Sequence, residues 1–204
     1  YKYATNIMKS GDFEKAERYF KDGLRLWEIV YGNKSRQEVA EKFEKANLLF
    51  NLGTLAFKGE KFEQAERILQ ESIKIRQVIA DTDLPLYAPA DYRFNILNIK
   101  GWCDSLCWLV FVFSALGNEK GARDCFSTAL KLSADINSIQ AKVHYYRAVY
   151  YFKVNQLDES LVSIKRSISI LCPTEEEAGN GLELFKAYIL MAKIEEKKGN
   201  DKES

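Results

Sequence analysis

The sequence has few side chains that could do chemistry, and they begin with its only histidine, His144, and its four cysteines. A nucleophile activated by a general base would have to use His144. Cys103 and Cys107 are four residues apart, so on a helix both thiols lie on one face, as two metal ligands would. A structural zinc site needs four ligands, and the distant Cys125, Cys172 and His144 are the others available. Because free cysteine is among the most buried residue types, we expect core positions and no metal.

Other catalytic and phosphate-binding patterns are missing from the sequence. No GxGxxG follows an expected strand, and no GxxxxGK[ST] occurs. The carboxylates are spread over expected helix surfaces, where solvated faces and pairs four residues apart account for them. His144 stands where we expect a bulky side chain to pack between helices. The sequence therefore predicts no enzyme activity, no catalytic residue and no cofactor.

Composition narrows the class of protein further. The 204 residues are 47% apolar, enough for a buried core, and only 3 prolines and 11 glycines interrupt them, so long helices are expected. With 30 basic against 29 acidic side chains, no charge excess draws nucleic acid or an anionic membrane. The most apolar run, 106–117, is too short to cross a bilayer, so we interpret it as a buried helix. Cysteines without a disulfide framework indicate an intracellular and cytoplasmic protein.

A spaced pattern of small and bulky residues recurs four times along the chain. Each copy has a small anchor, a large apolar residue four positions later, a small residue seven positions later and, with one exception, a small residue twelve positions earlier. The four sets are Ala4, Ala16, Phe20 and Gly23; Gly53, Ala65, Leu69 and Ser72; Val110, Ala122, Phe126 and Ala129; and Ala148, Ser160, Ile164 and Ser167. Spacings of 3, 4 and 7 place the anchor and its followers on one helical face. The residue twelve positions earlier lies on a preceding helix, where a small side chain allows close approach.

This pattern resembles the tetratricopeptide repeat (TPR), whose signature includes Leu-Gly, then Ala-x3-Phe. The clearest copy is LLFNLGTLAFKGEKFEQAERILQES, residues 48–72, and HYYRAVYYFKVNQLDESLVSIKRS, residues 144–167, is nearly as good. The third copy departs from the signature, because Val110 stands where Gly or Ala is expected. The anchors are further apart than the usual repeat of about 34 residues. In this the sequence resembles the longer repeats of kinesin light chains.

The resemblance implies an all-α fold, a helix-turn-helix repeat solenoid wound as a right-handed superhelix, forming one domain over 1–204. Its units are expected near 1–31, 36–81, 91–135, 137–172 and an incomplete 175–204. The expected helices span about 1–10, 13–31, 36–58, 62–81, 91–116, 119–135, 137–154, 157–172 and 175–198. Pro85 and Pro89 predict a loop over 82–90, and Thr174 with Glu177 predicts a capping box before the last helix.

The end of the chain, GNDKES, resembles GDFEKA near its start, residues 11–16. The match predicts a turn at Gly199 and an anchor at Ser204, so we expect further repeats beyond both ends of the chain. The last helix would then keep an apolar stripe for another element, or for a second copy, to cover. The stripe consists of Leu182, Phe185, Tyr188, Ile189 and Ala192.

In TPR domains the first helices of the pairs line an inner groove that commonly binds peptides, and the resemblance implies such a groove here. The residues that it places there are Asn47, Phe50, Asn51, Thr54, Phe57, Lys58, Asp104, Cys107, Phe111, Lys142, Tyr145, Val149 and Phe152. Of the cluster that holds a C-terminal carboxylate in chaperone-binding members, only Asn51 matches. An aromatic groove suits an amphipathic helix or an apolar strip. The alternative is that some of these aromatic side chains simply pack against a neighbouring helix.

The sequence predicts a protein-interaction scaffold that binds a peptide or helix of another protein through its concave face. It predicts neither nucleic acid nor membrane as a partner, and self-association or assembly into a larger complex stays open. Two alternatives remain: a regulatory helical domain of a larger enzyme or signalling protein, and a catalytic or ligand-binding helical protein in its own right.

Overall fold

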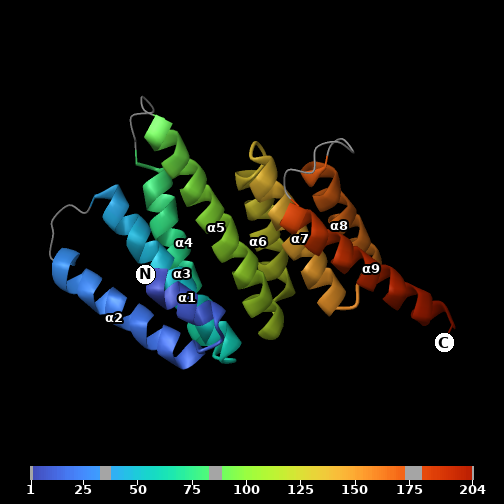
Figure 1. Cartoon of the computed structure of the whole chain (residues 1–204), viewed down its shortest axis with the longest axis horizontal. Helices are drawn as coiled ribbons and strands as arrows, with labels where there is room; N and C mark the ends of the chain where they lie inside the picture. Colours follow the sequence, from blue (N-terminus) through green and yellow to red (C-terminus); the bar gives the residue numbers. More distant parts are fainter. Residues whose placement is uncertain (1, 33–37, 83–88, 173–180, 204) are drawn as a thin grey trace. The chain divides into compact units, whose positions relative to one another are not determined.

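The computed structural model describes residues 2–32, 38–82, 89–172 and 181–203, and within these ranges it consists of nine helices without any strand. In chain order the helices are α1 (Lys2–Lys9), α2 (Phe13–Tyr31), α3 (Val39–Lys58), α4 (Phe62–Ala80), α5 (Pro89–Ala115), α6 (Glu119–Leu132), α7 (Asn137–Lys153), α8 (Leu157–Leu171) and α9 (Gly181–Glu203) (Figure 1). The predicted all-α fold is confirmed.

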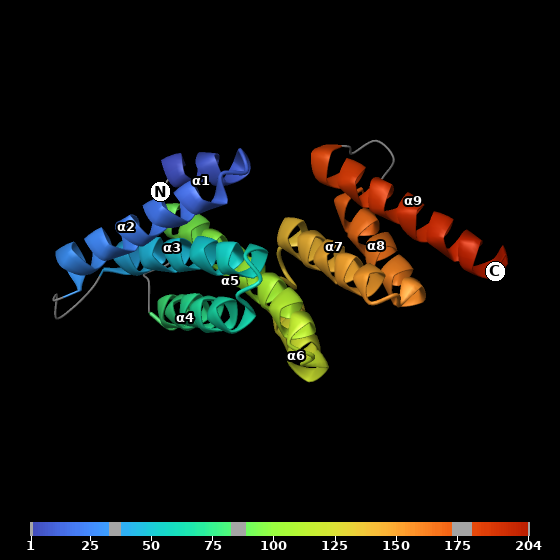
Figure 2. The ribbon, with the colours of Figure 1, turned by 90° about the horizontal axis from the view of Figure 1, so that it is seen from below.

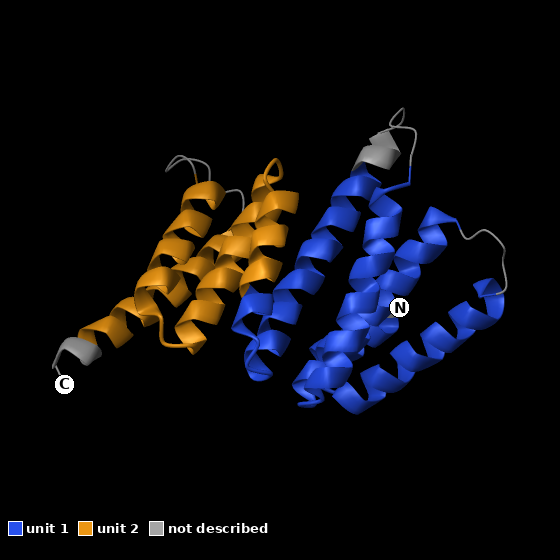
Figure 3. Cartoon of the chain, turned by 180° about the vertical axis from the view of Figure 1, so that it is seen from behind, with its two compact units in different colours: residues 1–122 blue, residues 123–204 orange. Residues whose placement is uncertain are grey.

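The helices form two compact units, Tyr1–Ala122 and Arg123–Ser204, and the boundary between them in the sequence falls within α6 (Figure 3). In the first unit α1 packs on α2, α2 on α3, α3 on α4 and α4 on α5, and α5 also contacts α3. Helix α3 therefore lies between α2 and α4 (Figure 2). In the second unit α7 packs on α8, and α9 contacts both. The predicted single domain over 1–204, with its five units, stays a prediction.

The recurring anchors are the tightest points of the helix pairs. Ala16, Ala65, Ala122 and Ser160 are all fully buried. A Cβ atom on Gly53 would lie 2.7 Å from Cγ of Leu69, so α3 and α4 approach as closely as a glycine allows. The small and bulky residues therefore pack at the contact between two helices, as their spacing predicts.

A hydroxyl seven residues after the anchor joins the two helices of a pair. Ser72 Oγ donates to the carbonyl oxygen of Ala46 at 2.8 Å, and Ser167 Oγ donates to that of Ala141 at 2.8 Å. All four residues are buried. The bond satisfies the serine hydroxyl inside the core, which explains how a polar residue occupies this position.

Several helix ends differ from the prediction, among them the start of α5 and the end of α9. Helix α5 begins at Pro89, two residues earlier than expected, because proline at the first helical position lacks only an N–H that would have no partner. The predicted turn at Gly199 is wrong, since α9 continues through it to Glu203. Gly11, its sequence counterpart, has φ +91° and forms a turn, whereas glycine inside a helix costs only about 1 kcal/mol and need not end it. The predicted capping box at Thr174 lies outside the described residues.

Helix α5 contains a stretch, Arg93–Ala115, of 23 residues that is long and apolar enough to cross a membrane by length and composition. This stretch is longer than the run that the sequence analysis singled out. In the folded protein 61% of the most apolar part of this stretch is buried. The core helix of a globular protein has the same length and composition, so these two properties alone do not indicate a membrane span. The contacts of α5 with α3 and α4 account for that burial.

Candidate functional site

The inner-face residues predicted on α3 are held in part by their own helix. Asn51 and Thr54 are buried. Asn51 Nδ2 donates to the carbonyl oxygen of Asn47 at 2.7 Å, and Thr54 Oγ1 donates to that of Asn51 at 2.8 Å. Phe50 is half-buried, and Lys58 is exposed with its ammonium 4.3 Å from the ring centroid of Phe13.

The structure brings together the aromatic residues that were predicted on α3 and α5. The ring of Phe57 lies 6.4 Å from that of Phe111 and 5.6 Å from those of Trp108 and Phe62, measured between centroids. Phe111 is buried, whereas Phe57 and Asp104 are half-buried. Cys107, which was expected on the same face, is buried as well. Part of this aromatic set therefore packs between α3 and α5.

The predicted inner-face residues of α7 pack toward the core that α9 completes. Tyr145, Val149 and Phe152 are half-buried against a cluster that includes Ala187 and Ile194 of α9. Lys142 is half-buried, with its ammonium 5.7 Å from the ring centroid of Tyr146. Like Phe50 and Phe57, Tyr145 and Phe152 keep the partial exposure that a binding groove requires, and their role in binding stays a prediction.

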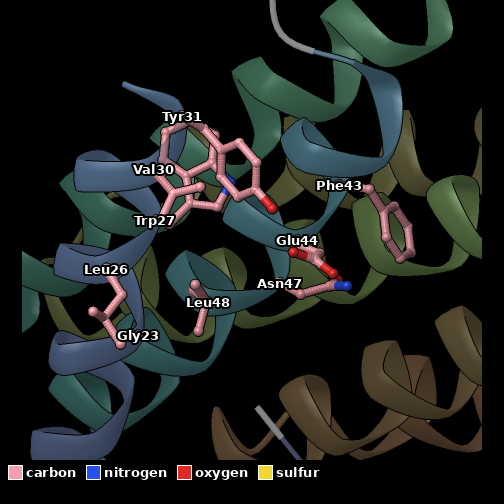
Figure 4. A pocket seen from close by; sticks show the side chains of 9 residues that line it. All are labelled: Gly23, Leu26, Trp27, Val30, Tyr31, Phe43, Glu44, Asn47 and Leu48. Carbon is pink, nitrogen blue, oxygen red and sulfur yellow. The ribbon is translucent and has the colours of Figure 1, made fainter. Parts of the chain in front are cut away.

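A cleft of 560 Å³ opens in the first unit between α2 and α3 (Figure 4). It is mainly apolar and aromatic, with one carboxylate and one amide side chain. The lining residues are Gly23, Leu26, Trp27, Val30, Tyr31, Phe43, Glu44, Asn47 and Leu48. Asn47 is the only one of them that the sequence analysis placed in a binding surface.

The α2 wall of the cleft depends on Trp27, which neighbouring groups hold in place. Its indole Nε1 donates to the carbonyl oxygen of Glu41 at 2.9 Å. The ammonium of Lys45 lies 4.8 Å from the ring centroid and pairs with Glu28 at 2.8 Å and Glu71 at 3.6 Å. The hydrogen bond on its polar side and the ammonium over its ring together hold the Trp27 indole in place.

The α3 wall is held from behind by Arg76 of α4, which is fully buried. Arg76 Nη2 donates to Oδ1 of Asn47 at 2.6 Å, and its guanidinium lies 5.5 Å from the ring centroid of Phe43. Phe43 also packs on Phe94 at 4.9 Å between centroids. Arginine only donates, so the Asn47 oxygen must face it, which orients the amide. Gly101 of α5 leaves the space, because a Cβ there would overlap the guanidinium.

The open side of the cleft carries apolar and acidic groups. Leu26 and Val30 are 61% and 57% exposed, and Ile29 beside them is 66% exposed. Glu44 is exposed too, and among the described residues its carboxylate has no ion-pair partner. Apolar surface around a carboxylate is an arrangement for binding an apolar group that carries a hydrogen-bond donor.

The residues that could have done chemistry are placed elsewhere. Cys103 and Cys107 are buried, as predicted. His144 is half-buried, and burial lowers its pKa to about 4, with Arg147 and Arg166 adding to the shift. Its imidazole is therefore neutral at pH 7. Over the described ranges, no three His, Cys, Asp or Glu side chains are grouped as metal ligands would be.

The sequence analysis missed most of the cleft because it followed the repeat signature. The signature concerns one helix pair at a time, whereas the cleft forms between the second helix of one pair and the first helix of the next. A signal was present in α2: Leu26, Trp27, Ile29, Val30 and Tyr31 make its last turns apolar on more than one face. A single packed face does not need that many apolar residues.

Comparison with known proteins supports the fold. The crystal structure of BtubC (BKLC) from P. vanneervenii, a kinesin light chain-like helical-repeat protein, matches with a TM-score of 0.65. The match has 17% sequence identity and covers 96% of this chain and 70% of that chain. No family model and no curated protein matches the sequence. The chain thus has a TPR-like helical-repeat fold.

Proposed function

We propose that this protein is an interaction scaffold that binds a peptide or helix of a partner protein, and that the cleft between α2 and α3 is a docking site. The observation that carries the proposal is that three side chains of a mainly apolar lining are held in place before a partner binds. Trp27, Phe43 and Asn47 are each fixed by a neighbour outside the cleft. A partner that enters does not have to order these side chains, so less binding free energy is lost.

A protein segment fits the cleft better than an isolated small molecule does. The apolar surface is not confined to the lining, because exposed Ile29, which lies between Leu26 and Val30 in the sequence of α2, adds to it. An exposed apolar stripe that continues a hollow is the usual form of a groove for an amphipathic segment. We further propose that the predicted inner-face residues Phe50, Phe57, Tyr145 and Phe152 serve partner binding.

The experiment is a selection of random twelve-residue peptides displayed on phage against the folded protein, followed by affinity measurement with the enriched peptides. Val30→Asn places an uncharged amide on the apolar surface of the cleft and should weaken the selected peptides by about tenfold. Val162→Asn is the matched control, because Val162 is a valine on α8 that is 70% exposed.

Circular dichroism must show that both variants keep their helix content. Equal loss of affinity in both variants, or no loss in Val30→Asn for every selected peptide, would contradict docking at this cleft. Binding that depends instead on Phe57 or Phe152 would move the docking site to the predicted inner face.

A further inference from the structure

We infer that the segment bound in the cleft carries a lysine or arginine beside its apolar residue, and that this cation pairs with Glu44. The inference rests on the proposed docking function and adds the charge of the partner to it. The inference follows from a comparison of the carboxylates around the cleft, since the others have an ion-pair or hydrogen-bond partner and Glu44 has no ion-pair partner among the described residues.

Glu44 is the single charged side chain among the nine that line the cleft. The nearby acids are engaged: Glu28 and Glu71 both pair with Lys45, and Glu41 accepts the backbone N–H of Glu38 through Oε2 at 3.0 Å. The negative charge offered to an occupant is therefore that of Glu44. A carboxylate next to an apolar wall favours a cationic donor over any other group.

The positive groups near the cleft do not cancel this charge. Lys45 lies over the indole and between two carboxylates. Arg76 is fully buried on α4, and its Nη2 is spent on the amide oxygen of Asn47. Neither residue lines the cleft. An acidic segment would bring a second carboxylate against Glu44, and burial would make that repulsion stronger.

The shape of the cleft also suits a long basic side chain. Lysine and arginine lay their aliphatic stems on apolar surface while the charged end stays near water. Here Leu26 and Trp27 of α2 and Leu48 of α3 offer such a surface, and Glu44 lies one helical turn before Leu48 on α3 (Figure 4). The apolar neighbour of that residue in the partner would rest on exposed Val30 and Ile29.

The test repeats the phage selection with wild-type protein, Glu44→Lys and the control Glu195→Lys, which reverses an exposed charge on α9. Wild type and control should both enrich lysine or arginine next to a large apolar residue. Glu44→Lys should enrich aspartate or glutamate at that position instead. Enrichment of acidic or uncharged sequences on wild type would overturn the inference.

A double-mutant cycle measures the pair itself. Replacing the basic residue of a selected synthetic peptide by glutamine should weaken binding to wild type by about fivefold, and binding to Glu44→Gln by much less. Equal weakening in both would show that the cation does not meet Glu44. Peptides that depend on Val30 but show no charge preference would overturn this inference and leave the proposed function standing. If no peptide depends on Val30, the proposed function itself fails.

Discussion

Two helix hairpins, α3–α4 and α7–α8, share two kinds of internal contact and differ in what they build around them. Both place a small residue of the first helix against a bulky one of the second, and both join the helices through a serine hydroxyl. The difference comes one turn after that serine: Arg76 stands in the first hairpin and Leu171 in the second, and both are buried. The repeat thus sets the helix pairing and leaves the next turn free to vary.

The helix that packs on each hairpin, α5 on α3–α4 and α9 on α7–α8, is complementary to the residue in that position. Helix α5 presents Gly101 and Asn98 to α4: Gly101 leaves room for the guanidinium of Arg76, and Asn98 Nδ2 donates to the Arg76 carbonyl oxygen at 3.0 Å. Helix α9 presents Ala187, Leu190 and Ile194, an apolar face. In α7, α8 and α9, these apolar residues form hydrophobic core. In α3, α4 and α5, Arg76 contacts Asn47 and Phe43 and so supports a wall of the cleft.

The largest expected effect is a loss of stability when the close contact between Gly101 of α5 and Arg76 of α4 is disrupted. Gly101→Leu should destabilise the protein by about 3 kcal/mol, because a Cβ there would overlap Cζ of Arg76, and this buried guanidinium could move away only by giving up its bond to Asn47. Chemical denaturation measures the loss. Gly199→Leu is the control, since nothing lies near that glycine and it is also helical. Similar losses in both would refute the packing of Arg76 on α5.

The next effect concerns the contact shared by the two hairpins. Gly53→Leu should destabilise by about 1–3 kcal/mol, since even a Cβ atom there lies 2.7 Å from Leu69 Cγ. Thermal unfolding followed by circular dichroism detects such a change. A variant that melts with the wild type would mean that α3 and α4 are paired wrongly.

A smaller effect tests whether the two serine bonds are equivalent. Ser72→Ala and Ser167→Ala should each cost about 1 kcal/mol, because each leaves a buried carbonyl oxygen without its hydroxyl donor. The two free energies of unfolding should agree within about 0.5 kcal/mol if the hairpins are built alike. A large loss of stability in one variant alone would show that the two serine hydrogen bonds do not contribute equally, although the hairpins have similar backbones.

The smallest effect is a pH dependence of stability that comes from His144 on α7. Burial lowers the pKa of His144 to about 4, below its ordinary value of 6.5. The unfolded chain then binds the proton more readily, so this contribution to stability is complete above pH 6.5 and is lost as the pH falls toward 4. Partial exposure keeps the effect modest. In His144→Gln, the slope of stability against pH between 4 and 6.5 should decrease, and an unchanged slope would contradict the shift.

The contrast explains what the sequence could predict. Gly53, Ala65 and Leu69 are recognisable because their spacing is short and their sizes are characteristic, so the helix pairing followed from pattern alone. The site of Arg76 draws on Asn47, Asn98 and Gly101 from two other helices, and no local spacing connects them. An arginine there reads as a surface residue, since arginine is rarely fully buried.

The same limit applies to the ends of elements and to surfaces. Nothing in GNDKES distinguishes a turn from a helix that continues, and helix α9 continues. The apolar stripe predicted on α9 is confirmed as exposed, because Leu182, Phe185, Tyr188 and Ile189 are all uncovered in the described structure. A local sequence pattern can predict that this stripe is apolar, but it holds no information about which element would pack on it.

The most direct test of the central claim, that the cleft supported by Arg76 is a docking site, is site-specific photocrosslinking. Benzoylphenylalanine would replace, one at a time, Leu26 at the cleft, Lys58 on the predicted inner face and Val162 on α8, all of them exposed. A peptide from the phage selection would then be irradiated with each variant. The account predicts an adduct at position 26 and none at 162. An adduct at 58 without one at 26, or equal adducts at all three, would contradict it.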